Sequence, residues 1–403
     1  MKLRPLLKEH HSIFVAFSFF IITFIVYLYT GEGDPTPYNN FVRLADAFLH
    51  GRLHLTENVR WLELAPVDGK YYVVPPPMPA ILLLPFVAIF GLSTNQTIAS
   101  VFLGSLNVSL AFLLARELSK GRSIQLWATA MFGFGTIHWW LAATGSVWLF
   151  SQVTSVTFLL LAIYATLKNK HPFLAGILLG ASFWSRLPTV FSLPFFIVMF
   201  ADKWIEKPNG APVISRIKVK PLIHLGLGLS IFVFLNFLYN YLRFGTPLDV
   251  SYYLIPGVLE ERWYREGIFD ISYIPRHLKA IFWEFPIFLS VPPYIMPSWS
   301  GLAIWITTPA FIYALFAGIR NRLALGCWLS IIPTALVLFT HGTWGFSQFG
   351  YRFAVDFYPF LFLLTLKGMG DKIKWHHKVL ITMGILVNLW GVLWINKFGW
   401  VRY

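Results

Sequence analysis

The sequence predicts an all-α polytopic membrane protein, a bundle of about eleven transmembrane helices with a large folded first extracytoplasmic loop. Hydrophobic residues make up 57% of the 403 residues and charged residues only 12%, whereas soluble domains carry about 25% charged residues. Several apolar runs reach the roughly 20 residues that a helix needs to cross a bilayer. Short segments rich in Lys and Arg separate these runs, which is typical of cytoplasmic loops. We expect one transmembrane domain over residues 1–403.

The charge pattern and the cysteine content argue against a nucleic-acid-binding protein, a disulfide-bonded protein and a cysteine-based metal site. The formal net charge is +14, which in a soluble protein would suggest a nucleic-acid partner. Here much of the basic excess lies in short loops, so membrane topology accounts for it and no nucleic-acid partner is expected. The single cysteine, Cys327, lies in an apolar run, which excludes an internal disulfide and a cysteine-based metal site.

The apolar runs define the expected spans. Residues 13–29 form a run that is longer than the apolar core of a signal peptide and has no small-residue cleavage site after it, so we expect a retained first helix. The other expected single spans are residues 96–115, 124–143, 148–167, 222–242, 302–318, 323–339, 353–366 and 379–395. The basic segments expected inside are residues 2–8, 115–122, 167–171, 203–220, 319–322 and 367–378.

The order of the basic segments places the ambiguous run at residues 78–91. The first helix takes the chain out and the basic segment 115–122 must lie inside, so only one crossing fits between them. The run 78–91 is also too short for a simple span. We therefore expect it to be interfacial or re-entrant, within a first outer loop of residues 31–95.

The same argument applies to residues 173–200. Because the basic segments on both sides are expected inside, this run crosses twice or not at all. The break Ser-Arg-Leu-Pro at residues 185–188 predicts two short helices with Arg186 near the turn. Residues 244–300 then form a second large outer loop.

The first outer loop carries its own structural signals. Residues 39–55 have apolar side chains at helical spacing, which predicts an amphipathic helix on the membrane that ends at Gly51. Residues 61–74 predict a β-hairpin around Asp68-Gly69. A folded structure therefore covers the outer end of the first helix.

Two acids, Glu32 and Asp34, lie at that end among glycines and prolines. A carboxylate held near the interface under a folded loop can act as a general base for an incoming hydroxyl or amine. It can also help to bind a divalent cation such as Mg²⁺ or Mn²⁺. The alternative is that both are ordinary solvated loop acids.

A second group of polar residues lies where an outer loop enters the helix predicted at 353–366. Arg352 has the planar fork that suits phosphate, although it also fits an interfacial anchor. Asp356 follows four residues later and is expected to pair with Arg352 on one helix face. Substrate contacts are expected from Tyr351, Gln348 and Asp356, and from Tyr38 in the first loop.

Two further arginines are candidates for phosphate binding. Arg186 lies in an apolar hairpin, and an intramembrane charge is expensive enough to suggest function. Arg243 lies at the outer end of a predicted helix, where an anchoring role competes with substrate binding. The histidines show no metal-binding spacing.

Taken together, four stretches resemble the GT-C superfamily of polytopic glycosyltransferases, in the bacterial branch near the protein O-mannosyltransferases and the lipid A aminoarabinose transferase. The stretches are GEGDPTPYNNFVRLADAFLHGRL (31–53), GKYYVVPPPMPAILLLPFVAIFG (69–91), GILLGASFWSRLP (176–188) and QFGYRFAVDFYPFLFLL (348–364). Their order along the chain and their common outer location carry the resemblance.

The resemblance implies inverting transfer of a sugar from a polyprenyl-phosphate donor on the outer face of a bacterial inner membrane. It implies that Asp34 is the catalytic carboxylate, with Glu32 beside it, and that outer basic residues, Arg352 and Arg186 with Arg243 next, hold the donor phosphate. Two features depart from the mannosyltransferases. Their adjacent Asp-Glu pair is here Glu32-Gly33-Asp34, and no soluble C-terminal acceptor domain is expected. The acceptor is thus a lipid, a glycan or a protein.

Two other classes compete with this interpretation. A transporter or flippase for lipids or lipid-linked sugars would favour broken helices near the midplane, and the break at residues 185–188 is such a feature. A structural membrane protein would need no acid beneath a folded loop. Convergence of Asp34, Arg186 and Arg352 on one cavity would favour the enzyme.

Overall fold

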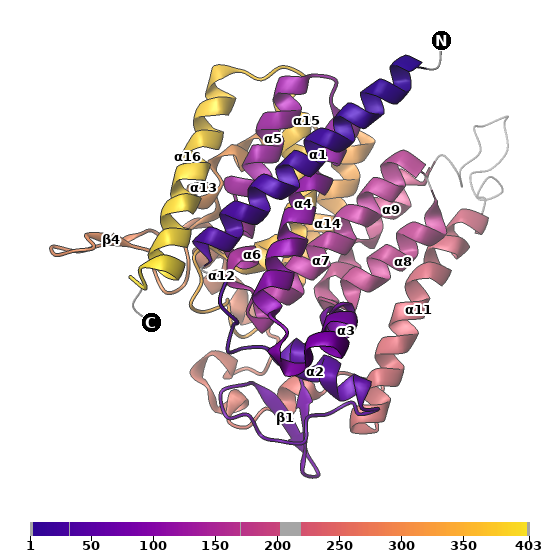
Figure 1. The fold of residues 1–403 in the computed structure, drawn as a ribbon, viewed down its shortest axis with the longest axis vertical. Helices are drawn as coiled ribbons and strands as arrows, with labels where there is room; N and C mark the ends of the chain where they lie inside the picture. The colour runs from indigo at the N-terminus through magenta and orange to yellow at the C-terminus, as the bar shows by residue number, and fades with distance from the viewer. Residues whose placement is uncertain (1–2, 32, 170, 202–218, 401–403) are drawn as a thin grey trace.

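The computed structural model describes residues 3–31, 33–169, 171–201 and 219–400. It is a bundle of helices that run roughly side by side, with short helices and a hairpin gathered at its lower end (Figure 1). Glu32 and most of the basic segment 203–220 lie outside the described residues.

Six helices among the described residues are long and apolar enough to cross a membrane, and they coincide with six of the expected spans. They are α1 (Leu3–Thr30), α4 (Gln96–Leu118), α7 (Val147–Tyr164), α11 (Val219–Phe244), α14 (Arg322–Phe339) and α16 (Trp375–Val392). The total of about eleven crossings stays a prediction.

Three expected single spans are not continuous α-helices: the run 353–366 begins with a 3₁₀ segment, and two others are broken. The run 124–143 forms α5 (Arg122–Phe134) and α6 (His138–Thr144), because α5 ends at Gly135. The run 302–318 forms only α13 (Ile304–Thr307) and a 3₁₀ segment, Pro309–Phe316. Pro309 has no N–H to continue a helix, and it disfavours helical geometry at the residue before it.

The apolar hairpin at residues 173–200 forms two short helices, as expected. These are α8 (Pro172–Phe183) and, after a 3₁₀ segment at Leu187–Ser192, α9 (Leu193–Met199). With 12 residues, α8 is only about 18 Å long, well short of the roughly 30 Å hydrocarbon core. The break therefore leaves Arg186 inside the bundle.

Helix α3 (Met78–Phe90) contacts this break and does not run beside the long helices for their full length (Figure 1). The Met78 N–H donates to the Trp184 carbonyl oxygen at 3.2 Å. Helix α2 (Asn40–Leu49) packs on α3, and its Phe41 ring lies 6.0 Å from that of Phe150 on α7.

The amphipathic helix predicted to end at Gly51 is confirmed as α2, which ends just before a Gly51 with φ of 67°, but its apolar face lies on protein. Its apolar face is buried because α3 and the outer end of α7 supply an apolar surface, with Phe41 and Leu44 both 0% exposed. The predicted hairpin is confirmed as β1 (Leu64–Val67) and β2 (Lys70–Val73), which pair antiparallel. Asp68 and Gly69 have φ of 47° and 74°, as a two-residue hairpin turn requires.

The segment expected to form the second outer loop, residues 244–300, contains short 3₁₀ turns, α12 (Ile274–Phe282) and a small hairpin of β3 (Ile287–Phe288) and β4 (Ile295–Met296). It joins the first loop at the lower end, where the Phe244 and Tyr72 rings lie 5.2 Å apart. Helix α15 (Tyr358–Met369), which follows a 3₁₀ segment at Arg352–Phe357, returns the chain upward.

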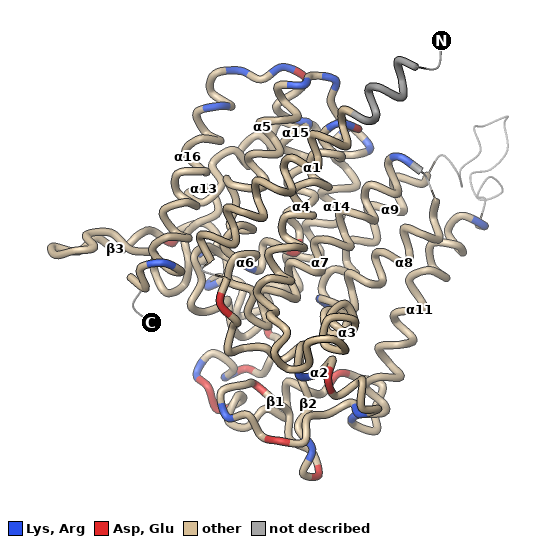
Figure 2. Tube along the Cα trace, in the orientation of Figure 1, with Lys and Arg blue, Asp and Glu red and all other residues tan. Residues whose placement is uncertain are grey.

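Charged residues separate along the bundle (Figure 2). Lys and Arg dominate the upper end, whereas the lower end beside the folded loops carries most of the Asp and Glu together with further Lys and Arg. This is the distribution that the positive-inside rule predicts if the upper end faces the cytoplasm.

Candidate active site

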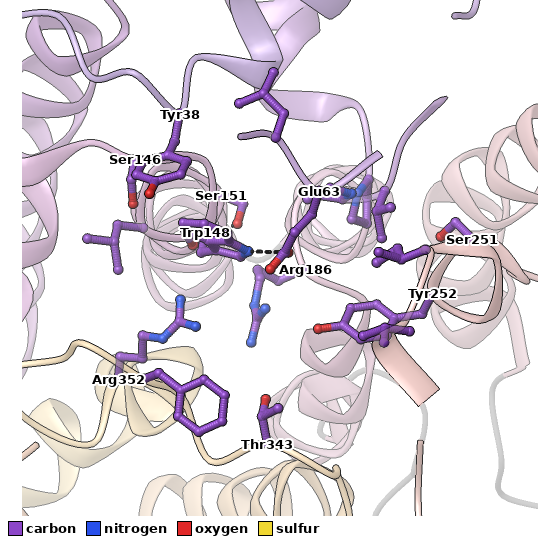
Figure 3. A pocket seen from close by; sticks show the side chains of 18 of the residues that line it. Tyr38, Glu63, Ser146, Trp148, Ser151, Arg186, Ser251, Tyr252, Thr343 and Arg352 are labelled. Atoms are coloured by element: carbon purple, nitrogen blue, oxygen red, sulfur yellow. Dashed lines mark hydrogen bonds between the residues drawn. The ribbon is translucent and has the colours of Figure 1, made fainter. Parts of the chain in front are cut away.

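A cavity of about 1560 Å³ lies at the lower end of the bundle, between the ends of α1, α7 and α14 and the loop segments 31–95 and 244–300. Asp34, Arg186 and Arg352 all line it, although they lie far apart in the sequence. Aromatic side chains from several elements form much of the remaining wall; they include Tyr38, Trp61, Trp148, Tyr252, Trp263 and Phe346. Figure 3 shows Arg186 and Arg352 directed into this space from two different elements.

Asp34 follows a turn that the local sequence specifies. Gly33 has φ of 70°, a conformation that other L-residues rarely adopt. The carbonyl oxygen of Gly33 accepts a bond from Asn95 Nδ2 at 2.8 Å, and the Thr36 N–H donates to Thr97 Oγ1 at 3.2 Å. These bonds tie the segment to the start of α4 while the Asp34 side chain is exposed in the cavity.

Asp356 pairs with Arg186 and not, as predicted, with Arg352. Arg186 Nη2 donates to Asp356 Oδ2 at 2.8 Å, and Nε lies 3.3 and 3.2 Å from the two carboxylate oxygens. The prediction assumed an α-helix, but residues 352–357 form a 3₁₀ segment with three residues per turn. Residues four apart then point in different directions, and Asp356 turns toward the break after α8.

Arg352 is a cation without a partner among the described residues. Its backbone is held on both sides, because its N–H donates to Gln348 Oε1 at 3.1 Å and its carbonyl oxygen accepts from Gln152 Nε2 at 2.8 Å. Its Nε is buried and makes no hydrogen bond. The guanidinium carbon lies 5.4 Å from the Phe353 ring centre. A partly buried cation without an acidic partner is stabilised by an anionic ligand.

Glu63 is a cavity residue that the sequence analysis missed. Its Oε2 accepts a hydrogen bond from Trp148 Nε1 at 3.1 Å, and the Tyr38 ring lies 5.1 Å from the Trp148 ring (Figure 3). Glu63 is accessible through the cavity. The protein around it nevertheless displaces enough water to raise the pKa of its carboxyl group. The hydrogen bond from Trp148 and the positive charge of Arg352 both oppose this rise. An acid just before a hairpin gives no sequence signal, because loop acids are common.

Three other predicted residues lie behind the described cavity wall. Gln348 Nε2 donates to the carbonyl oxygens of Ser300, Trp344 and Gly345, which fixes the loop before Arg352. Tyr351 is 1% exposed and shares a 2.7 Å hydrogen bond with His277 Nδ1. These side chains, with Asp356, shape the site from outside.

Arg243 does not belong to the cavity lining that the structure describes. Its guanidinium donates to the Val73 carbonyl oxygen at 2.9 Å and to Asn240 Oδ1 at 2.6 Å, and it lies over the Tyr239 ring at 4.0 Å. The bond to Val73 joins α11 to the first-loop hairpin, and the position of Arg243 away from the described lining does not support the expected phosphate role.

The described residues contain no group of three or more His, Cys, Asp or Glu side chains that could hold a metal ion. A divalent cation at Asp34, the position that the sequence suggested, would need further ligands from substrate or water.

No protein-family model matches the sequence, and no curated protein sequence matches it. The fold is similar to the crystal structure of ArnT from Cupriavidus metallidurans bound to undecaprenyl phosphate, with a TM-score of 0.53 and 12% sequence identity. The match covers 91% of this chain and 62% of that chain, so this chain spans less than two thirds of the ArnT length. The likeness shows that this chain has the GT-C fold.

Proposed function

We propose that this chain is a GT-C-type glycosyltransferase that moves a sugar from a polyprenyl-phosphate donor to an acceptor on the extracytoplasmic face. The convergence of Asp34, Arg186 and Arg352 on one cavity carries the proposal. The fold adds support, because a structure of the same fold binds undecaprenyl phosphate. We place the protein in the bacterial inner membrane, where a site on the outer face lacks nucleotide sugars and a lipid must deliver the sugar.

Arg352 is the first candidate for the donor phosphate. Its guanidinium faces the cavity without an acidic partner among the described residues, and a phosphate would satisfy both its charge and its free donors. Arg186 is the second candidate. Its charge is largely offset by Asp356, so we assign it a supporting role in which the bound carboxylate fixes the direction of the guanidinium.

Asp34 accepts the proton of the acceptor in this proposal. A lone pair of the acceptor hydroxyl or amine attacks the anomeric carbon, and the bond from that carbon to the phosphate oxygen breaks with inversion. The electron pair stays on polyprenyl phosphate, which Arg352 stabilises, and the proton passes to the Asp34 carboxylate. Glu32, which lies outside the described residues, is proposed as a secondary acid that shapes the local field.

The acceptor is a lipid, a glycan or a protein that reaches the cavity from the outer face or the outer leaflet. Tyr38 lines the cavity and is proposed to contact substrate. The other predicted contacts, Tyr351, Gln348 and Asp356, act through the positions of Arg352 and Arg186. A divalent cation is not needed for any step above.

The proposal is tested with protein in nanodiscs and a panel of radiolabelled polyprenyl-phosphate sugars, supplied with outer-membrane lipid and glycan extracts as acceptors. We expect labelled sugar to leave the donor lipid, with polyprenyl phosphate as the second product. Movement of intact donor between leaflets, without formation of polyprenyl phosphate, would instead support the flippase alternative.

A further inference from the structure

The contact between Glu63 and Trp148 joins two elements that form opposite parts of the cavity. Glu63 lies in the first loop just before β1, whereas Trp148 lies in the first turn of α7. The indole N–H donates to Glu63 Oε2 at 3.1 Å. Within the described part of the chain no hydrogen bond to Glu63 Oε1 is formed, and the carboxyl group points into the cavity (Figure 3). One carboxylate oxygen is therefore held and the other is open to a ligand.

Glu63 also lies on the phosphate side of the cavity. Glu63 and Arg352 line the same cavity with their side chains facing one space (Figure 3), and the positive charge of Arg352 opposes the rise in the pKa of Glu63. Asp356 is the other acid that acts on Arg352, but it is bound to Arg186 and lies behind the described lining. Glu63 is thus the cavity-facing carboxylate that is coupled to the unpaired arginine. Tyr252 projects into the same space from the segment 244–300 (Figure 3).

The chemistry of the donor links the open carboxylate oxygen of Glu63 to the charge of Arg352. In a polyprenyl-phosphate sugar the phosphate is bonded directly to the anomeric carbon, so a phosphate on Arg352 holds the sugar ring within a few ångströms of that guanidinium. A bound phosphate also offsets the attraction that Arg352 exerts on Glu63. The open carboxylate oxygen then needs a hydrogen-bond donor, and the hydroxyl groups of a sugar supply one.

We propose that Glu63 and Trp148, with Tyr38 packed on the indole, form the subsite for the transferred sugar. Glu63 Oε1 accepts a hydrogen bond from a sugar hydroxyl or amine, Trp148 fixes the carboxylate through Oε2, and the aromatic rings offer an apolar face to the sugar. This inference rests on the proposed donor, and it assigns Glu63 to sugar recognition and Asp34 to the acceptor side.

The test compares two ligands, undecaprenyl phosphate and a panel of the same lipid carrying a hexose, a pentose or an aminopentose. Affinities are measured by native mass spectrometry for the wild type and Glu63→Gln. We expect at least one sugar-bearing lipid to bind more tightly than the bare lipid. Glu63→Gln should lose that gain, by roughly tenfold or more, because a hydrogen bond to a charged group is lost. Binding of the bare lipid should not weaken, because loss of the Glu63 charge leaves Arg352 at least as attractive to a phosphate.

Glu261→Gln is a matched control, because Glu261 is also a cavity acid that accepts a bond from an indole, that of Trp263. It should leave both affinities unchanged. Trp148→Phe keeps a ring but removes the N–H donor, so it should lower sugar-lipid affinity in part and add little to Glu63→Gln. A purely structural role for Glu63 would instead weaken both ligands equally.

The outcomes separate this inference from the proposed function. If the wild type binds neither undecaprenyl phosphate nor any sugar-bearing lipid, the proposed donor is wrong and the inference falls with it. If undecaprenyl phosphate binds but no sugar improves the affinity, or if Glu63→Gln keeps the improvement, the donor stands and the sugar subsite is overturned.

Discussion

Asp356→Asn should destabilise the folded protein strongly, because Arg186 loses its counter-charge. The Asp356 side chain is 0% exposed and that of Arg186 is 20% exposed, and three donor–acceptor contacts of 2.8 to 3.3 Å join the two groups. Breaking a buried ion pair by removing one partner costs about 3–5 kcal/mol. Arg186 keeps some access to cavity water, so we expect a loss near the lower end, about 3 kcal/mol.

Arg352→Ala is the matched comparison. Arg352 lies over the same ring, Phe353, with its guanidinium carbon at 5.4 Å where that of Arg186 is at 5.6 Å. It has no ion pair among the described residues, so its removal breaks none, and we expect a change within about 0.5 kcal/mol. The structure thus predicts a large loss of stability when Arg186 loses its partner and little change when Arg352 is removed.

The assay is denaturant-induced unfolding of purified protein in mixed micelles, followed by intrinsic fluorescence. The double variant Arg186→Met with Asp356→Leu should recover most of the loss, because apolar replacement of a whole buried pair is often neutral. Equal losses for Asp356→Asn and Arg352→Ala, or a double variant as unstable as Asp356→Asn, would refute the pairing.

Three further predictions concern the donor, the topology and the pH dependence. Arg352→Ala should weaken undecaprenyl phosphate binding about ten- to a hundredfold. Arg352→Lys should recover only part of the affinity, because lysine lacks the planar guanidinium. If native mass spectrometry shows unchanged affinity for both variants, Arg352 does not bind the phosphate. In a Cys327→Ala background, a cysteine at Ser93 should react with an impermeant thiol reagent from outside and one at Lys120 should not; the reverse pattern would invert the bundle. Because the surrounding protein displaces water from Glu63 and so raises its pKa, the free energy of unfolding should fall as pH rises above the ordinary Glu value through the raised one. Glu63→Gln should show less of this fall in pH-dependent unfolding. An identical pH profile for the two proteins would mean that the pKa of Glu63 is not raised.

Periodicity and turn chemistry predicted most of the bundle and parts of the first loop. The six long helices and the Asp68-Gly69 hairpin follow from apolar run length and from two residues that adopt positive φ. The break at Arg186 followed from a single charge before a proline. These features depend on local sequence, so a sequence is enough to find them.

Features that depend on three-dimensional packing could not be predicted from the local sequence. The spacing of Arg352 and Asp356 suggested a pair only on the assumption of an α-helix, and the 3₁₀ geometry redirects Asp356 to Arg186. The amphipathic pattern of α2 is the same whether its apolar face meets lipid or protein, and only the position of α3 decides between them.

The candidate site was predicted in part. Asp34, Arg186 and Arg352 were chosen because charges are scarce in this chain and each lies at the end or break of an apolar run, and all three line one cavity. Glu63 lies in a polar loop where an acid is unremarkable, and its importance comes from Trp148, 85 residues away. Arg243 had the same helix-end signal as Arg352, but its guanidinium donates to Val73 of the first-loop hairpin and to Asn240 on its own helix.

The most direct test of the central claim is sugar transfer by Asp34→Asn, measured as release of polyprenyl phosphate from the donor lipid by purified protein in nanodiscs. Asparagine keeps the shape of the side chain and removes its ability to accept a proton. General-base assistance contributes roughly a hundred- to ten-thousandfold in rate. We predict a loss of that size, with undecaprenyl phosphate still bound at wild-type affinity and with unchanged unfolding. Turnover near the wild-type rate would contradict the account.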